Sequence, residues 1–192
     1  GVLCAVLTPM AIRLAVRSGA LDHPADHKSH KSPIPHLGGL AIVTAFTGAV
    51  VLAAIARPPE GGLGVLLPLL LIATALALVG LMDDLRELSP AWRVIAETGA
   101  AVVVWVLGSG VTVTGSDALN LILTVLWIVG ITNAFNLLDN MDGLAAGLGA
   151  ITCVSMFLVA SANGQFLVAA LAIGLAGCTA GFLRHNFHPA SI

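Results

Sequence analysis

Four polar side chains recur at three-residue intervals directly after a hydrophobic stretch of the chain. They are Asn133, Asn136, Asp139 and Asp142, and the apolar run before them covers residues 119–131. A carboxylate at the centre of a bilayer costs about 2.5 to 3.5 kcal/mol on insertion scales, so these groups belong at a membrane face or in a wet cavity. Either place indicates a binding or catalytic site. The alternative, typical of a lone Asp-Gly, is a polar loop and helix cap between two spans.

Helix geometry predicts a turn within this segment. Each three-residue step on a regular helix advances by about 300°, so the four side chains would spiral around about half the circumference. They could converge more easily if the helix ended near Asp139. Asn140 and Gly143 are residue types that tolerate the positive φ of such a turn. We therefore predict a helix end followed by a polar turn.

A second acidic pair, Asp83 and Asp84, follows another apolar run. Carboxylate oxygens suit Mg²⁺, which takes one or two carboxylates and completes its shell with waters and substrate phosphates. The sequence therefore predicts a metal site, with a phosphate ester as the substrate. The candidate ligands are Asp83, Asp84, Asp139 and Asp142. Taken alone, the Asp83-Asp84 pair has the alternative interpretation of a solvated span end.

A basic segment precedes the first glycine pair. Lys28, His30, Lys31 and His36 could bind phosphates, and Gly38-Gly39 would let backbone amides approach them closely. A loop that contacts lipid headgroups is an equally good interpretation of this segment.

Composition sets the class of the protein. Hydrophobic residues make up 58% of the chain and charged residues only 9%, whereas soluble domains carry about 25% charged residues. We therefore expect an all-α, polytopic transmembrane helix bundle that forms one domain over residues 1–192. A net charge of −2 without a basic block gives no reason to expect nucleic acid as a partner. Cys4, Cys153 and Cys178 lie in apolar runs without metal-site spacing and are expected to be small buried residues.

Seven apolar segments are expected to cross the membrane, the first of them as the end of a span. They cover residues 2–16, 38–56, 63–82, 91–107, 119–131, 144–160 and 165–183. Glu97 follows Arg93 by one helical turn, so the two side chains could pair.

Seven crossings place four polar segments on one face: residues 17–37, 83–93, 132–143 and 184–192. This face has every lysine and arginine except Arg57, so the positive-inside rule makes it the cytoplasmic face of the plasma (inner) membrane. A transporter or channel is the alternative class. It would more typically have ionisable residues in mid-span and repeat symmetry, which this chain lacks.

The ordered motifs resemble those of the polyprenyl-phosphate N-acetylhexosamine-1-phosphate transferases (glycosyltransferase family 4), over about the whole chain. The motifs are Asp22-x-Pro24, Lys28-x-His30, Pro35-x-x-Gly38-Gly39, Asp83-Asp84, Asn133-x-x-Asn136-x-x-Asp139-x-x-Asp142-Gly143 and Asn186-Phe187-x-Pro189-Ala190. The resemblance implies a bundle of about ten or eleven spans, of which about seven are present here. It also implies transfer of a sugar-1-phosphate from a UDP-sugar to undecaprenyl or decaprenyl phosphate, with Mg²⁺ (or Mn²⁺), and release of UMP.

The resemblance also assigns roles to particular residues. Asp83 and Asp84 would be the catalytic pair at the metal and lipid-phosphate site, and Lys31 and Asn186 would line the substrate cleft. The candidate substrate-binding residues are Lys28, His30, Lys31, Asn133, Asn136, Asp139, Asp142 and Asn186. The first loop favours the N-acetylglucosamine branch, which initiates cell-wall and lipopolysaccharide synthesis, over the phospho-N-acetylmuramoyl-pentapeptide branch. A homodimer is compatible with this interpretation.

Two departures from the family pattern stand out. Asn140 takes the place of a glycine that many members have, and it suits the same turn. The chain also stops at Ile192, before the family's Gly-Asp-x-Gly-Ser segment and its histidine-rich loop. The resemblance therefore predicts an incomplete enzyme with little or no activity alone. A non-catalytic membrane protein is the corresponding alternative.

Overall fold

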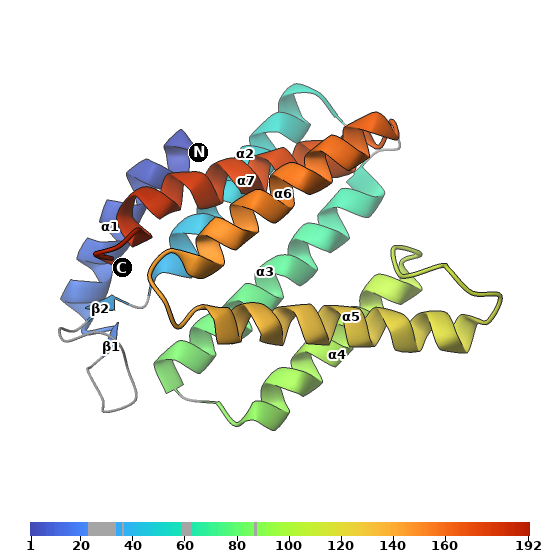
Figure 1. Cartoon of the computed structure of the whole chain (residues 1–192), viewed down its shortest axis with the longest axis horizontal. Coiled ribbons are helices and arrows are strands. Elements are labelled where there is room, and N and C mark those ends of the chain that lie inside the picture. Colours follow the sequence, from blue (N-terminus) through green and yellow to red (C-terminus); the bar gives the residue numbers. More distant parts are fainter. Residues whose placement is uncertain (23–33, 36, 59–62, 87) are drawn as a thin grey trace. The chain divides into compact units, whose positions relative to one another are not determined.

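Helices make up most of the described chain (Figure 1). The computed structural model describes residues 1–192 except 23–33, 36, 59–62 and 87. The helices in this part of the chain are α1 (Val2–Ser18), α2 (Gly38–Ala56), α3 (Leu63–Arg86), α4 (Pro90–Val106), α5 (Asp117–Leu138), α6 (Leu144–Ala162) and α7 (Phe166–Asn186). Strands β1 (Leu21–Asp22) and β2 (Ile34–Pro35) pair antiparallel and are two residues long. The prediction of an all-α polytopic bundle is confirmed.

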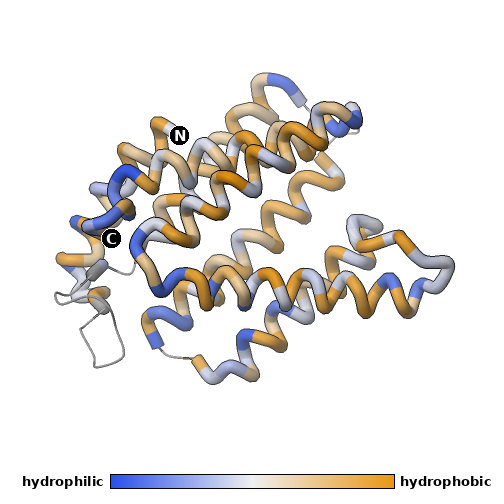
Figure 2. The backbone as a smooth tube through the Cα atoms, in the orientation of Figure 1, coloured by the Kyte–Doolittle hydropathy of each residue, from blue (hydrophilic) through white to orange (hydrophobic). Residues whose placement is uncertain are grey.

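Within the described ranges, five helices are long and apolar enough to cross a membrane: α2, α3, α5, α6 and α7. Figure 2 shows their hydrophobic character along most of each tube. Helices α1 and α4 have 17 residues each, and at 1.5 Å per residue they rise about 26 Å, less than the ~30 Å hydrocarbon core. Large apolar side chains such as Leu71, Trp127 and Phe166 are exposed. Lipid contact accounts for that exposure in a multi-pass membrane protein.

Contacts among the described residues group the chain into two compact units, and the single domain expected from the sequence stays a prediction. Unit 1 contains residues 1–60 and 138–192, and unit 2 contains residues 61–137. Helices α1, α2, α6 and α7 belong to unit 1. Helices α3, α4 and nearly all of α5 belong to unit 2.

Small side chains form the core of unit 1. The buried residues of α1 are Cys4, Thr8, Ala11 and Ala15, and those of α7 are Ala169, Ala172, Ala176, Cys178, Thr179 and Phe182. Small residues let membrane helices approach closely, and packing then replaces the hydrophobic driving force that lipid cannot supply. All three cysteines are buried and free, as predicted.

The beginnings of two helices of unit 1 lie beside the end of a third. A Cβ added at Gly38, the first residue of α2, would lie 2.9 Å from the Phe182 ring near the end of α7. One added at Gly143, just before α6, would lie 3.5 Å from the carbonyl oxygen of Asn186. The beginnings of α2 and α6 therefore lie beside the end of α7, as the assignment of their flanking segments to one face predicted.

The loop between α4 and α5 in unit 2 is fixed by buried polar side chains. The backbone N–H of Val111 donates to Thr124 Oγ1 at 2.9 Å, and that of Thr114 donates to Asn120 Oδ1 at 3.0 Å. Asn120 Nδ2 returns a bond to the carbonyl oxygen of Thr114 at 3.1 Å. These bonds satisfy loop backbone groups that would otherwise be costly to place near lipid.

The close packing of this loop gives a stability prediction for Gly110→Ala. A Cβ there would lie 2.9 Å from Thr124 Oγ1 and 3.1 Å from Trp105 Cα, so the backbone must shift. We expect the variant to lose about 1–3 kcal/mol of unfolding free energy, measured by denaturant titration in detergent micelles. Gly115→Ala, in the same loop, meets nothing within 4 Å and is the matched control. Equal stability of both variants would contradict the described packing.

Candidate active site

The polar motif spans a helix end, as predicted. Helix α5 continues past the last residue of the apolar run, Ile131, to Leu138, next to the expected end at Asp139, and therefore includes Asn133 and Asn136. A turn follows, and Gly143 adopts φ 71° just before α6 begins. Asn133 and Asn136 thus belong to unit 2, whereas Asp139 and Asp142 belong to unit 1. The site residues form two groups, one in each unit.

In unit 2, the aspartate pair lies in the last turns of α3. Carboxylates are disfavoured near the negative end of a helix dipole, so they need cationic neighbours. Arg93 of α4 supplies one, because its Nη1 donates to Asp83 Oδ2 at 2.7 Å. Arg86 lies in the last turn of α3 itself.

The predicted pairing of Arg93 with Glu97 is wrong. Arg93 bonds with Asp83 across the short α3–α4 connection. Glu97, 6% exposed, accepts a hydrogen bond from Asn133 Nδ2 of α5. Both charged residues of α4 therefore bond with a neighbouring helix. A pair between Arg93 and Glu97 along the surface of α4 would instead leave Asp83 and Asn133 without these partners.

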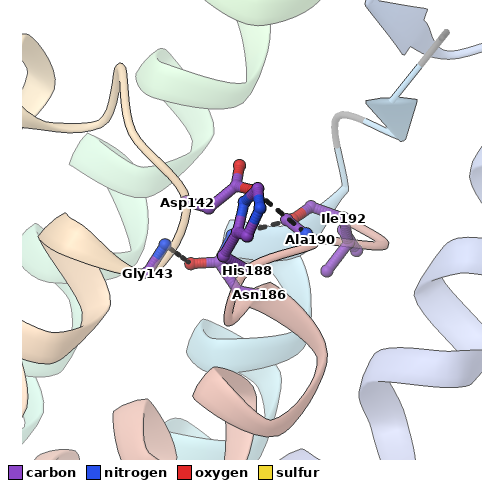
Figure 3. A network of polar contacts seen from close by, with 6 residues as sticks. All are labelled: Asp142, Gly143, Asn186, His188, Ala190 and Ile192. Carbon is purple, nitrogen blue, oxygen red and sulfur yellow. Dashed lines mark hydrogen bonds and ion pairs between the residues drawn. The ribbon is translucent and has the colours of Figure 1, made fainter. Parts of the chain in front are cut away.

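In unit 1, the turn before α6 is tied to the segment after α7 (Figure 3). Asp142 Oδ2 accepts a hydrogen bond from the backbone N–H of Ala190 at 3.1 Å and lies 2.8 Å from His188 Nδ1. The backbone N–H of Gly143 donates to Asn186 Oδ1 at 3.1 Å. Asn186 Nδ2 in turn donates to the carbonyl oxygen of Ile192 at 2.7 Å. Two of the predicted site residues, Asp142 and Asn186, are thereby brought together.

Asp139 has a distinct electrostatic environment in the turn. The residue as a whole is exposed to solvent. Neighbouring atoms of the protein still partly desolvate its carboxylate, and this desolvation raises the pKa of Asp139 above the usual aspartate value. The ionised form of Asp139 is therefore less favoured than that of a fully solvated aspartate. A cation or a hydrogen-bond donor at this position would offset that cost.

The donor set fits Mg²⁺ by its chemistry. Asp83 and Asp84 form a carboxylate pair in unit 2, and Asp139 and Asp142 form another in unit 1. Either pair alone offers the one or two carboxylates through which Mg²⁺ binds, together with waters and substrate phosphates. Among the described residues, no three His, Cys, Asp or Glu side chains gather in one group that could bind a metal.

Three predicted phosphate-binding residues, Lys28, His30 and Lys31, lie outside the described residues, as does His36. Asn136 is exposed and lies on α5, three residues after Asn133.

His188 was not predicted as a site residue, and its contribution to stability should be small. Its side chain is 81% exposed, against 30% for its partner Asp142. Solvent screens exposed ion pairs, and the N–H of Ala190 still bonds with Asp142 without the imidazole. We expect His188→Ala to change the unfolding free energy by less than ~1 kcal/mol, as measured by denaturant titration. A larger loss would mean that the imidazole, not the backbone amide, fixes Asp142.

Sequence reasoning also missed the roles of Arg93 and Glu97 as partners of site residues. Two features of the sequence could have indicated these roles. Arg93 follows closely after the polar residues that end α3, and Glu97 is a carboxylate within an apolar segment. Such a residue in a membrane helix needs a partner on another element.

Comparisons with known proteins agree with this arrangement of motifs. The chain is 34% identical to a protein of Bacillus subtilis (strain 168) named as a probable undecaprenyl-phosphate N-acetylglucosaminyl 1-phosphate transferase, over 97% of this chain and 53% of that protein. It is 35% identical to the decaprenyl-phosphate N-acetylglucosaminephosphotransferase of Mycobacterium tuberculosis (strain ATCC 25618 / H37Rv), over 100% of this chain and 54% of that protein. Similarity extends to a phospho-N-acetylmuramoyl-pentapeptide-transferase of Rubrobacter xylanophilus, at 32% identity over 84% of this chain and 56% of that protein.

The chain spans about half the length of the curated relatives it matches. The family model described as glycosyl transferase family 4 matches residues 66–192, a range that contains the aspartate pair, the Asn/Asp motif and the segment after α7. The chain therefore belongs to glycosyl transferase family 4.

Proposed function

We propose that this protein transfers N-acetylglucosamine-1-phosphate from UDP-N-acetylglucosamine to undecaprenyl or decaprenyl phosphate, with Mg²⁺ as cofactor and UMP as the second product. The observation that most supports this proposal is the share of the chain that each kind of relative matches. Relatives named for N-acetylglucosamine transfer match 97–100% of this chain. Those named phospho-N-acetylmuramoyl-pentapeptide-transferase match 84–88%. The product would begin a cell-envelope polysaccharide, and pentapeptide transfer is the second candidate.

Polar contacts within each unit support a site role for the residues that make them. In unit 2, the Asp83–Arg93 and Glu97–Asn133 contacts both lie toward the α3–α4 connection. In unit 1, Asp142 and Asn186 lie where α6 begins and α7 ends. By the positive-inside rule, we assign these ends to the cytoplasmic face of the plasma membrane.

The chemistry follows from the charge of the acceptor. A phosphate monoester has a second pKa near 6, so the lipid phosphate is mostly dianionic at neutral pH and needs little help from a general base. Asp83 or Asp84 would position this phosphate and accept any residual proton. The lipid phosphate oxygen attacks the β-phosphorus of the UDP-sugar in line, and the bond from that phosphorus to the bridging oxygen breaks as UMP leaves.

Electrostatics decide how readily two anions meet. Bound through the carboxylates of Asp83, Asp84, Asp139 or Asp142, Mg²⁺ would supply charge neutralisation for the pyrophosphate. A covalent aspartyl-phosphate route is the alternative. Labelled sugar nucleotide supplied without lipid acceptor would leave label on the protein only if that route operates.

The test uses the protein at its native length in lipid nanodiscs with undecaprenyl phosphate and Mg²⁺. One reaction receives UDP-N-acetylglucosamine and the other the UDP-N-acetylmuramoyl-pentapeptide, and both UMP and lipid-linked sugar are measured. We expect both products with the first donor only. Turnover with the pentapeptide donor alone would establish the second candidate. Absence of turnover with either donor in folded protein would favour a non-catalytic membrane protein.

A further inference from the structure

Helix α4 contributes two charged side chains that bond with residues of the proposed site on two other helices. We propose that Arg93 and Glu97 are positioning residues, which fix the side chains of Asp83 on α3 and Asn133 on α5 for the transfer step. This inference rests on the proposed transferase function and adds two residues to its machinery. All four side chains belong to unit 2.

The Arg93–Asp83 contact has the geometry of a fixed pair. Arg93 Nη1 lies 2.7 Å from Asp83 Oδ2, and the two side chains are 25% and 16% exposed. Arg93 Nε is buried and has no hydrogen-bond partner among the described residues, so the Nη1 bond is the contact that orients the guanidinium. A carboxylate has about four lone-pair sites on its two oxygens. Arg93 can therefore orient Asp83 through Oδ2 while Oδ1 keeps its capacity to accept a bond.

The Glu97–Asn133 contact orients an amide in the same way. Asn133 Nδ2 donates to Glu97 Oε2 and also to the carbonyl oxygen of Val129, the latter at 2.9 Å. An amide nitrogen has two hydrogens, so both are used. Glu97 Oε2 accepts one of these bonds, so Asn133 directs its nitrogen toward α4. Its oxygen is then available to a donor such as a substrate hydroxyl or ring N–H.

One face of α4 controls both contacts. Arg93 and Glu97 are four residues apart, so they lie on the same side of the helix. Glu97 is 6% exposed, and a charged residue this buried requires a partner. The two contacts therefore orient one acceptor from α3 and one from α5 relative to a single rigid helix.

A double-substitution cycle on Arg93 and Asp83 tests the inference. The native-length protein in nanodiscs is compared with Arg93→Gln, Asp83→Asn and both together, for turnover with UDP-N-acetylglucosamine and for thermal unfolding. Because Arg93 acts through Asp83, Arg93→Gln should lower kcat about 10- to 100-fold with KM changed less than ~3-fold. It should cause no further loss in the Asp83→Asn background. Arg93→Lys keeps the charge and should recover activity to within ~5-fold of the unaltered protein.

Matched controls separate positioning from general damage. Arg57→Gln removes an exposed arginine of unit 1 and should leave turnover unchanged. Glu97→Gln keeps an acceptor for Asn133 and should retain more than ~30% of kcat, whereas Glu97→Ala should lose at least ~10-fold. Equal losses for these two variants would show that the Glu97 carboxylate, not orientation of Asn133, matters.

The outcomes distinguish this inference from the proposed function. Multiplicative kcat losses in the cycle, or a KM change that dominates, would overturn positioning through Asp83 and assign Arg93 a direct substrate contact or a purely structural role. If the unaltered protein shows no turnover with any donor, the proposed function fails. The melting temperatures of the same variants then test the Arg93–Asp83 contact by itself. A double variant that is no less stable than the less stable of the two single variants supports the contact, and additive decreases in melting temperature overturn it.

Discussion

Asp83→Asn should reduce transfer by about 10²- to 10³-fold with little change in stability. The substitution keeps the shape of the side chain and one oxygen, but it removes the negative charge that the proposed site uses to bind metal and position the acceptor phosphate. It also removes the ion pair with Arg93, whose bond to Asp83 Oδ2 is 2.7 Å long. Because that pair is partly exposed, we expect the unfolding free energy to fall by no more than ~1 kcal/mol. Initial rates of UMP release and denaturant titration check the two expectations.

Asp117→Asn is the matched control for this substitution. Asp117 is an exposed carboxylate in the first turn of α5, where it interacts favourably with the helix dipole at about 0.3–1 kcal/mol. Its loss should leave UMP release within about 2-fold of the unaltered protein. Activity above a third of normal for Asp83→Asn, or equal losses for both variants, would remove Asp83 from the catalytic pair.

Asn186→Ala should be the most destabilising single polar substitution in unit 1. It removes the acceptor for the N–H of Gly143 and the donor for the carbonyl oxygen of Ile192, with bonds of 3.1 Å and 2.7 Å. Each backbone group left unpaired costs about 1–3 kcal/mol, so a total loss of about 2–6 kcal/mol is expected in denaturant titrations. Because the turn also fixes Asp142, UMP release by the folded fraction should fall at least ~10-fold.

Asn186→Asp and Asn163→Ala define the cause of that effect. The aspartate keeps an acceptor for Gly143 but loses the donor for Ile192, so its stability should lie between the alanine variant and the unaltered protein. Asn163 caps the other end of α6 through a local bond to Val159 at 2.8 Å. Its alanine variant should lose less than ~1 kcal/mol and keep its activity. An Asn186→Ala variant as stable as Asn163→Ala would contradict the described bonds.

Several features were decided by local sequence alone. The apolar segments predict the helices, because a chain in lipid must pair its backbone groups internally and a helix does so within one segment. The turn after α5 also follows from local chemistry, since Asn140 and Gly143 permit a chain reversal after the last apolar residues. The cysteines were expected to be buried, and Cys4, Cys153 and Cys178 are. The motifs themselves, read in order, gave the family.

Other features depended on contacts between distant segments. Arg93 was expected to pair with Glu97 because they are neighbours on one helix, yet Arg93 bonds with α3 and Glu97 with α5. The division of the Asn/Asp motif between two units, and the pairing of Asp142 with the segment after α7, also have no local signal. A charged side chain in a membrane protein bonds with the best partner within reach, and which groups come within reach is decided by helix packing. Residue spacing determined what chemistry the chain could offer, whereas packing alone decided which helix orients each of its carboxylates and amides.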